Sequence, residues 1–447
     1  MRKLISVVVC AFSFMTVMAG RTTYGLDQLL DSARHNNIAL RTAHYNIQVA
    51  QQQRKEAFTK YFPNVSATGL WFNASKDMAQ MEINPSDFIS PELGAALAQS
   101  FPPEALASLA NPMNVSMMKN GTIASVMAVQ PVFAGGRIVN GNRLARVGED
   151  VSRLQLQLSE NEVERTTEQY FWQLASLQEK MKTIETVEAF LQGLHKDVDV
   201  AVKAGVAMRN DLLQVQLRQN DVASQKLKLQ NGISLMRMLL SQYCGLRDTS
   251  FVINYNTEAI PPMALKQDHN VAAVNTAEYQ LMGKQVEAAQ LQVKMATGQN
   301  LPTVSVGAGY NYHNLLDKNR SFPMVFATVS IPISDWWAGS HSISKSKLEL
   351  QKAREQLTDN TELLVIGMQN AWNGVEEAYN RLNLAQLSIE QASENLRLNR
   401  DYYQAGISKM SDLLEAQMLY QQACDGRTDA FIDYQNKLLE YRLAVGQ

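Results

Sequence analysis

The side chains that most often carry out chemistry in enzymes are present in this chain, but they are not spaced for catalysis. None of the six histidines lies in an H-E-x-x-H sequence or at zinc-binding spacing from a cysteine. The chain also has no G-x-S-x-G sequence, no phosphate-binding loop and no G-x-G-x-x-G after a predicted strand. The histidines are His35, His44, His195, His269, His313 and His341. The sequence therefore predicts a protein that is not an enzyme and has no metal or cofactor site.

The elements that carry these residues occur twice. The segment 204–216 recurs as 405–417, and the same offset of 201 positions separates Gly245 from Gly446. Upstream, His35-Asn36 returns as His269-Asn270, which favours structural roles for both histidines. A repeat this long indicates a tandem duplication. We expect a signal peptide at 1–20, a first repeat at 21–245, a linker at 246–263 and a second repeat at 264–447.

The N-terminus is typical of a secretory signal. Arg2 and Lys3 precede an apolar run, Leu4–Val17, that is too short to span a bilayer. Cys10 lies inside this run, and we interpret it as discarded with the signal, with lipidation as the alternative. Cys244 and Cys424 remain, so one disulfide is possible but a disulfide framework is not. The net charge of −2 shows no excess of basic residues of the kind that nucleic-acid-binding proteins have.

Long helices are predicted wherever proline is missing. All 12 prolines lie outside 132–260 and 333–447, and proline is strongly unfavourable inside a helix. Apolar residues in these regions follow narrow seams typical of coiled-coil packing, as in Tyr170, Leu174, Leu177, Met181 and Ile184. A helix over 339–404 would be roughly 100 Å long. Helices are also expected near 26–60 and 264–297.

Four segments alternate between apolar and polar residues like strands: 63–75, 121–133, 302–314 and 322–334. Their length is that of membrane-spanning strands, although an ordinary hairpin of a soluble sheet would alternate in the same way. Four strands cannot close into a membrane barrel, so several chains would have to share one. The longer segment 74–120 is expected to be an external loop with a short helix around 91–106.

Several motifs, in order and in both halves, resemble the TolC-like outer membrane efflux proteins. These motifs are Gln130-Pro131-Val132-Phe133-Ala134-Gly135-Gly136-Arg137, its counterpart from Ile331 to Gly339, and Tyr403-Gln404-Ala405-Gly406 followed by Asp412-Leu413-Leu414. The resemblance covers the mature chain. It implies α-helical plus membrane β structure: a homotrimer with a 12-stranded barrel, four strands per chain, continued by a long α-helical coiled-coil periplasmic tunnel. Such proteins are passive exit ducts in outer membrane lipid that work with a periplasmic adaptor and an inner-membrane pump.

The resemblance also implies functional residues at the two hairpin tips, about 203–211 and 404–412. A periplasmic gate would involve Asp412, Glu415, Tyr403, Lys409, Arg209, Asn210 and Asp211. Adaptor docking would involve Gly205, Val206, Ala207, Gly406, Ile407 and Ser408. Ser408 occupies the position closest to one where the family often has a basic residue. The contacts that would hold the gate closed are therefore not defined by the resemblance. The alternative for Asp211 and Asp412 is a carboxylate that satisfies free amides at a helix N-terminus.

Two other classes of protein remain alternatives. A periplasmic coiled-coil adaptor also has long helical hairpins, but it would need a lipoyl-like strand module. A soluble coiled-coil scaffold would not need alternating strands with aromatic residues near their ends.

Overall fold

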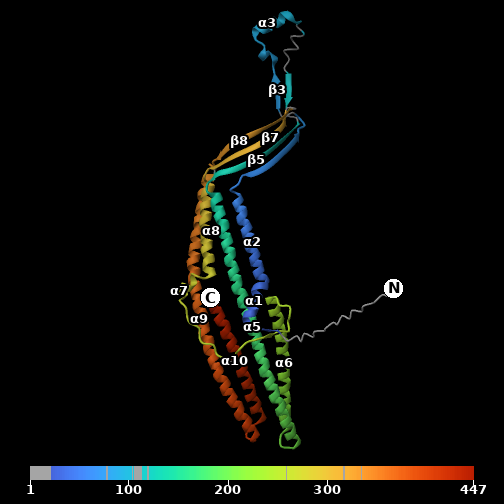
Figure 1. The fold of residues 1–447 in the computed structure, drawn as a ribbon, viewed down its shortest axis with the longest axis vertical. Helices are drawn as coiled ribbons and strands as arrows, with labels where there is room; N and C mark the ends of the chain where they lie inside the picture. Colours follow the sequence, from blue (N-terminus) through green and yellow to red (C-terminus); the bar gives the residue numbers. More distant parts are fainter. Residues whose placement is uncertain are drawn as a thin grey trace, which may run out of the picture. The chain divides into compact units, whose positions relative to one another are not determined.

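The computed structural model describes residues 22–76, 79–102, 104, 113–117, 120–257, 259–315, 318–333 and 335–446. The expected signal peptide, with Cys10, lies outside these residues. Packing divides the chain into two compact units. One comprises residues 50–149 and 286–353, and the other comprises the remaining segments, up to 49, 150–285 and from 354 onward. Figure 1 labels the elements and colours them along the sequence.

A four-stranded antiparallel sheet is the main feature of the first unit. Its strands are β2 (Asn64–Asn73), β5 (Asn120–Ala134), β7 (Thr303–Leu315) and β8 (Lys318–Ser330), and they pair in that order. Therefore β2 and β8 each keep one edge without a partner strand in the described chain. The fourth strand was predicted at 322–334, but it lies at 318–330. It begins opposite the end of β7, and it ends before Pro332, which has no N–H to donate.

The pairing register gives the sheet one apolar face. Val306 lies opposite Ala327, Ala308 opposite Val325, and Val126 opposite Tyr310. These residues share a face because neighbouring strands place paired side chains on the same side. The expected alternation of Val304, Val306, Ala308, Tyr310 and Tyr312 is therefore confirmed. Val325 on this face is 82% exposed in the single chain.

The segment between β2 and β5 is more structured than the expected loop. Strand β3 (Ala79–Ile83) pairs antiparallel with β4 (Met113–Met117). Between them lie a 3-10 turn, Pro85–Phe88, and helix α3 (Pro91–Ser100). Helix α3 ends before the predicted limit of 106, because Phe101 is extended ahead of Pro102. Residues 105 and 106 lie outside the described part.

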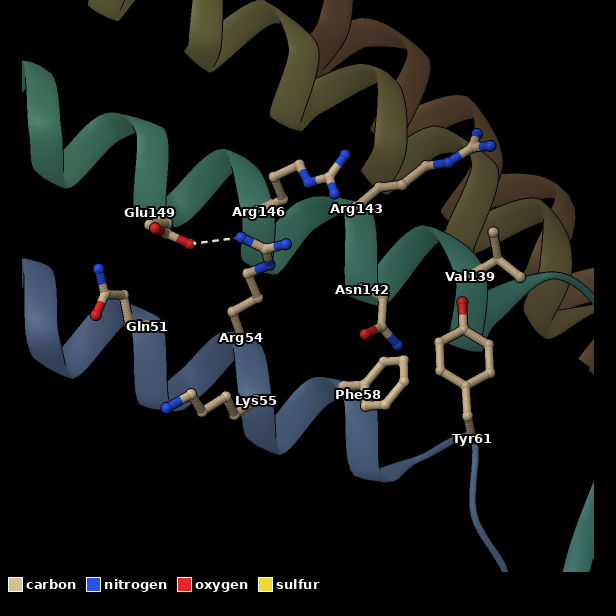
Figure 2. Close-up of a pocket in the computed structure, with 10 residues that line it drawn as sticks. All are labelled: Gln51, Arg54, Lys55, Phe58, Tyr61, Val139, Asn142, Arg143, Arg146 and Glu149. Carbon is tan, nitrogen blue, oxygen red and sulfur yellow. Dashed lines mark hydrogen bonds and ion pairs between the residues drawn. The ribbon is translucent and has the colours of Figure 1, made fainter.

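Helices α2 (Ile38–Thr59) and α5 (Arg137–Lys203) flank the start of β2 and the end of β5. In the first unit, Arg54 on α2 donates to Glu149 on α5 at 2.9 Å, and the side chain of Glu149 is almost fully buried. Figure 2 shows this ion pair between the two helices. The close approach of Gly135 and Gly298 leaves no room for a β carbon on either residue. Small residues are therefore needed where β5 passes into α5.

The other unit contains two long helical hairpins. The first joins α5 to α6 (Arg209–Cys244), and the second joins α9 (Asp335–Gln404) to α10 (Met410–Ala444). Their core includes Phe171, Leu240, Phe251 and Tyr434. The long helix expected over 339–404 is present and begins four residues earlier. None of the helices among the described residues is both long enough and apolar enough to cross a membrane.

The predicted helix over 26–60 is wrong in one respect, because it is broken at Asn37. Helix α1 (Leu26–Asn36) ends there, and α2 begins at Ile38. The side-chain oxygen of Asn37 accepts a hydrogen bond from the N–H of Ala39 at 2.8 Å. The side-chain NH2 group of Asn37 donates to the backbone carbonyl of Tyr243 at 3.1 Å. The side chain thus starts the next helix and ties it to the end of α6.

The second predicted helix, over 264–297, is also interrupted. Helix α7 (His269–Ala273) begins after Asp268, whose side chain accepts from the N–H of Asn270. Helix α8 (Ala277–Gln299) follows a turn in which the Thr276 hydroxyl accepts from the N–H of Tyr279. Polar side chains that cap helix starts explain both boundaries.

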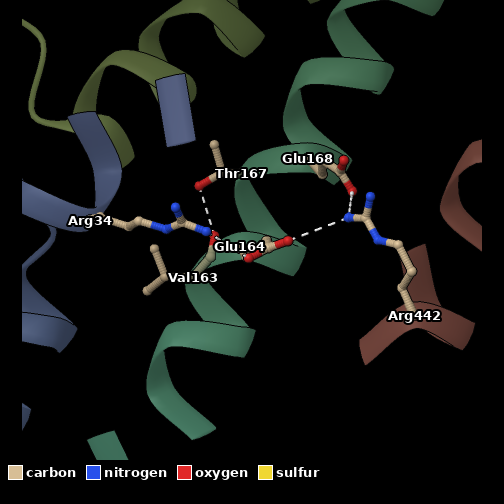
Figure 3. Close-up of polar contacts among 6 residues, drawn as sticks. All are labelled: Arg34, Val163, Glu164, Thr167, Glu168 and Arg442. Carbon is tan, nitrogen blue, oxygen red and sulfur yellow. Dashed lines mark hydrogen bonds and ion pairs between the residues drawn. The ribbon is translucent and has the colours of Figure 1, made fainter. Parts of the chain in front are cut away.

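Two very short strands tie the N-terminal segment to the predicted linker. Strand β1 (Thr23–Tyr24) pairs in parallel with β6 (Val252–Ile253). Tyr24 packs edge-on against Phe251 at 5.6 Å between ring centroids. The carboxylate of Glu164 on α5 accepts hydrogen bonds from Arg34 of α1 at 3.1 Å and from Arg442 of α10 at 3.3 Å (Figure 3). This carboxylate therefore joins the first and last helices of the unit.

Candidate functional site at the two hairpin turns

The turn between α5 and α6 is closed by backbone hydrogen bonds around one glycine. The N–H of Gly205 donates to the carbonyl of Val202 at 3.0 Å, and the N–H of Val206 donates to that of Ala201 at 2.9 Å. Gly205 has φ of 76°, in the left-handed region that favours glycine. A β carbon here would meet no neighbour within 4 Å, so only the backbone conformation demands glycine.

The turn between α9 and α10 has the same construction. The N–H of Gly406 donates to the carbonyl of Tyr403 at 3.0 Å, and that of Ile407 donates to Tyr402 at 2.9 Å. Gly406 has φ of 73°. Each of these bonds lies 201 positions after its counterpart in the first turn. The repeated sequence thus builds two equivalent turns.

Both turns present apolar side chains to solvent. Val206 is 80% exposed, Ile407 is 76% exposed and Met208 is 74% exposed. Ala207 and Ser408, also expected in this surface, are half-buried. Isolated apolar residues at a surface are ordinary, but Val206 and Ile407 occupy matching positions of the two turns, whereas the counterpart of Met208 is Lys409. The turns therefore offer a repeated apolar surface.

The acidic residues after each turn cap the following helix. An Asp211 carboxylate oxygen accepts from the N–H of Met208, and one of Asp412 accepts from the N–H of Lys409, both at 3.2 Å. Asp211 and Asp412 therefore make the contacts of carboxylates that cap a helix N-terminus. Capping satisfies free N–H groups and places negative charge at the positive end of the helix dipole. It does not preclude a second role, because Asp412 remains exposed.

The remaining predicted gate residues differ in burial. Arg209, Asn210, Lys409 and Glu415 are exposed, and Tyr403 is half-buried. Among the described residues, no three His, Cys, Asp or Glu side chains converge in a way that could hold a metal ion.

Tyr403 brings the two hairpins together. It packs against an apolar cluster that includes Val215 of α6 together with Met410 and Leu413 of α10. Burial raises the pKa of the Tyr403 hydroxyl, and the negative charges of Asp211 and Asp197 raise it further. The predicted gate residues Tyr403 and Asp211 are therefore electrostatic neighbours although they belong to different hairpins.

A polar cluster that the sequence did not reveal lies farther along α6 and α10. Arg218 donates from Nε to Gln417 at 3.1 Å and from Nη2 to Gln421 at 2.7 Å. Gln421 in turn donates to Gln225 at 2.9 Å. Burial lowers the pKa of Arg218. Gln417 and Gln421 are four residues apart, which would place them on one helix face, but nothing in the sequence places Arg218 opposite them.

The two cysteines do not form a disulfide. Cys244 and Cys424 are both free, and Cys244 is buried. Burial raises the pKa of the Cys244 thiol to about 12, so it stays protonated at neutral pH. The carbonyl of Cys244 accepts from the Ser32 hydroxyl at 2.9 Å. Its role is that of a small apolar residue at the end of α6.

The whole arrangement resembles outer-membrane channels of known structure. VceC from Vibrio cholerae matches with a TM-score of 0.72 over 94% of this chain and 96% of that one, at 14% identity. The CmeC channel of Campylobacter jejuni matches with a TM-score of 0.73 over 94% and 85%, also at 14%. The open-state MtrE channel of Neisseria gonorrhoeae gives 0.71 over 94% and 88%, again at 14%. The fold is therefore that of outer-membrane channels rather than that of an adaptor or scaffold.

A family match agrees with this class. Residues 269–447, which include the second pair of strands and the second hairpin, match the family described as outer membrane efflux protein. The similarity to this family is thus carried by the second half of the chain. No curated protein matches the chain in sequence at a significant level.

Proposed function

We propose that this chain is the outer-membrane exit channel of a tripartite efflux or secretion system, with a large periplasmic part. It conducts substrates passively from a pump and an adaptor to the exterior, and it catalyses no covalent reaction. The family match and the channel fold support the outer-membrane placement. The observation that carries the proposal for the channel itself is the four-stranded sheet with two free edges and one apolar face.

Three copies of the chain would complete the barrel. A free strand edge in lipid leaves N–H and C=O groups unpaired, at several kcal/mol each. Edge β8 of one copy would pair with edge β2 of the next, and three copies would give twelve strands. The apolar face with Val126, Ala308 and Val325 would then contact lipid. Phe326 would point inward, because its ring lies over Gly307, where a β carbon would be 2.3 Å from it.

The hairpin turns would form the periplasmic entrance. Exposed Asp412 and Glu415 from three copies would place six carboxylates near the axis, which favours cations. Tyr403, with Arg209, Asn210, Asp211 and Lys409, would set how tightly the entrance closes. Gly205, Val206, Ala207, Gly406, Ile407 and Ser408 would contact the helical hairpin tips of an adaptor.

Assembly is tested by native mass spectrometry of the protein extracted in detergent. We expect a mass of three chains and single-channel conductance in planar bilayers. A Val325→Arg variant should fail to insert, because Arg on a lipid-facing strand costs about 2–4 kcal/mol at the midplane. Thr328→Arg, on the opposite face of the same strand, is the matched control. A monomer with no conductance would contradict the proposal.

Docking is tested by photo-cross-linkers at Ala207 and Lys409 in cells with active efflux. We expect an adaptor subunit to be captured. Gly205→Val and Gly406→Val should abolish efflux while the trimer still reaches the outer membrane. If nothing is captured and both variants pump normally, adaptor docking lies elsewhere.

A further inference from the structure

A basic cavity lies between α2 and α5, in the unit that contains the sheet. It has a volume of about 670 Å³. Its charged lining consists of Arg54, Lys55, Arg143 and Arg146, opposed by Glu149 alone. Arg54 is engaged by Glu149 at 2.9 Å. Among the described residues, the other three cations have no carboxylate partner, so the cavity has an unbalanced positive charge.

The cavity has a charged end and an aromatic end. Figure 2 shows Phe58 and Tyr61 near Val139, where the chain leaves α2, and Arg54 farther along the helices toward Glu149. Phe58 packs edge-on against Tyr61 at 5.6 Å and against Phe62 at 5.5 Å between ring centroids. Arg143 and Arg146 extend from α5, and Lys55 lies on α2 next to Arg54 and extends toward Gln51. Lys55 and Arg146 line the same cavity as Arg54, so they are free cations available to a ligand there.

A second cavity of about 890 Å³ adjoins the first at Asn142. The two share Asn142, whose amide donates to the Ala57 carbonyl at 2.8 Å. The second cavity is lined by Phe62, Pro63, Pro131 and Ile138, among others. Lys60 and Arg137 also line this second cavity, but most of its surface is apolar. A basic cavity next to a mainly apolar one fits a ligand with an anionic head and a hydrocarbon chain.

The position in the fold favours a lipid as this ligand. Residues 58–64 lead directly into β2, and α5 begins three residues after β5 ends. In the proposed channel, these ends of the strands lie at the periplasmic surface of the outer membrane, where lipid phosphates are found. Aromatic side chains are enriched at such interfaces, and Lys and Arg beside them attract anionic headgroups. Phe58 and Phe62 are about half exposed.

We propose that the α2–α5 cavities bind an anionic phospholipid, with the phosphate near Lys55, Arg146 and Arg54 and an acyl chain along Phe62, Pro131 and Ile138. This inference rests on the proposed outer-membrane function. The proposal predicts that lipid binds at one defined place on the chain. Non-specific association of lipid with a membrane protein would not have this property.

The test is native mass spectrometry of the trimer with added dioleoylphosphatidylglycerol or dioleoylphosphatidylcholine. We expect the phosphatidylglycerol adducts to survive higher activation energies than the phosphatidylcholine ones. Lys55→Gln with Arg146→Gln should weaken phosphatidylglycerol binding roughly thirtyfold, since each cation near a lipid surface contributes about 1 kcal/mol. The matched control is Lys228→Gln with Arg400→Gln, which removes the same charge from exposed helix faces. This control should bind like wild type.

Other outcomes overturn the inference. Equal binding by the cavity variant and wild type would place the lipid elsewhere. Binding of inorganic phosphate or glycerol phosphate as strong as that of the lipid would make this a free-anion site. Conductance separates the two proposals: a trimer that conducts but shows no preference for phosphatidylglycerol refutes only the lipid site. A chain that forms neither trimer nor channel refutes the proposed function itself.

Discussion

Arg218 and Gln421 join the two long hairpins at a distance of 2.7 Å, from Nη2 of the arginine to Oε1 of the glutamine. Among the described residues, no carboxylate forms an ion pair with this arginine, and its second bond goes to Gln417, which is 1% exposed. A partly buried guanidinium that is held by neutral amides satisfies their oxygens but gains little charge pairing. The bond is therefore more important for fixing the two helices together than for net stability.

Replacing this arginine should loosen the hairpins. In Arg218→Ala, the amide oxygens of Gln417 and Gln421 lose their donor, which costs about 1–3 kcal/mol for a buried group. We expect a lower Tm in detergent and a less regular conductance. Arg400→Ala, at an exposed position of α9, should leave both unchanged. An unchanged Tm in Arg218→Ala would mean that water replaces the guanidinium.

The effect of a glycine-to-alanine substitution on stability should change sign with the position of the glycine. Gly205→Ala forces a β carbon into φ of 76° and should lower stability by about 1 kcal/mol. Gly193→Ala lies inside α5 with open space around it, so it should raise stability by up to about 1 kcal/mol. Thermal unfolding of the two variants side by side measures the difference. Equal effects would show that the turn relaxes at no cost.

The two roles of Asp412 can be separated by paired substitutions. Asn keeps an oxygen that accepts from the N–H of Lys409 but removes the charge, whereas Ala removes both. If the carboxylate acts at the entrance, both variants should weaken cation preference equally. If Asp412 only caps α10, Asn should behave like wild type and Ala should lower the Tm. Reversal potentials under a salt gradient, together with Tm, give the answer.

Glu168 should make stability depend on pH. Burial raises its pKa above the ordinary value of 4.5, Arg442 at 3.6 Å opposes this, and Glu164 and Asp27 add to it. The folded state thus binds this proton more tightly than the unfolded chain does. The stabilisation that protonated Glu168 gives to the folded state is fully present below pH 4.5. It is lost as the pH rises through the raised pKa of the folded state.

Replacement by an uncharged amide tests this dependence. The Tm of Glu168→Gln minus that of wild type should become more positive as pH rises from 4 to neutrality. The exposed Glu160→Gln on the same helix is the control, and its difference should be smaller. A difference for Glu168→Gln that shrinks with rising pH would mean that Arg442 outweighs burial.

Local patterns in the sequence predicted the elements well. The alternation in 302–314 and the absence of proline after 332 are properties of neighbouring residues, and they indicated β7 and α9 within a few positions. The break at Asn37 was missed because its side chain is held by the Tyr243 carbonyl, which lies 206 residues away in sequence. Arg218 was missed for the same reason, since its partners belong to another hairpin. Contacts between distant segments depend on packing, which no local pattern reports.

The short parallel ladder of Thr23–Tyr24 with Val252–Ile253 has a consequence for the order of folding. Its two strands are more than 200 positions apart, so β1 has no partner until most of the first hairpin and the following segment have been made. Contacts of such separation form late, because the entropy of closing a long loop opposes them. While the chain folds, residues 23 and 24 would therefore stay unpaired until residues 252 and 253 are in place. Pairing of β1 would then be among the last steps in the assembly of the helical unit.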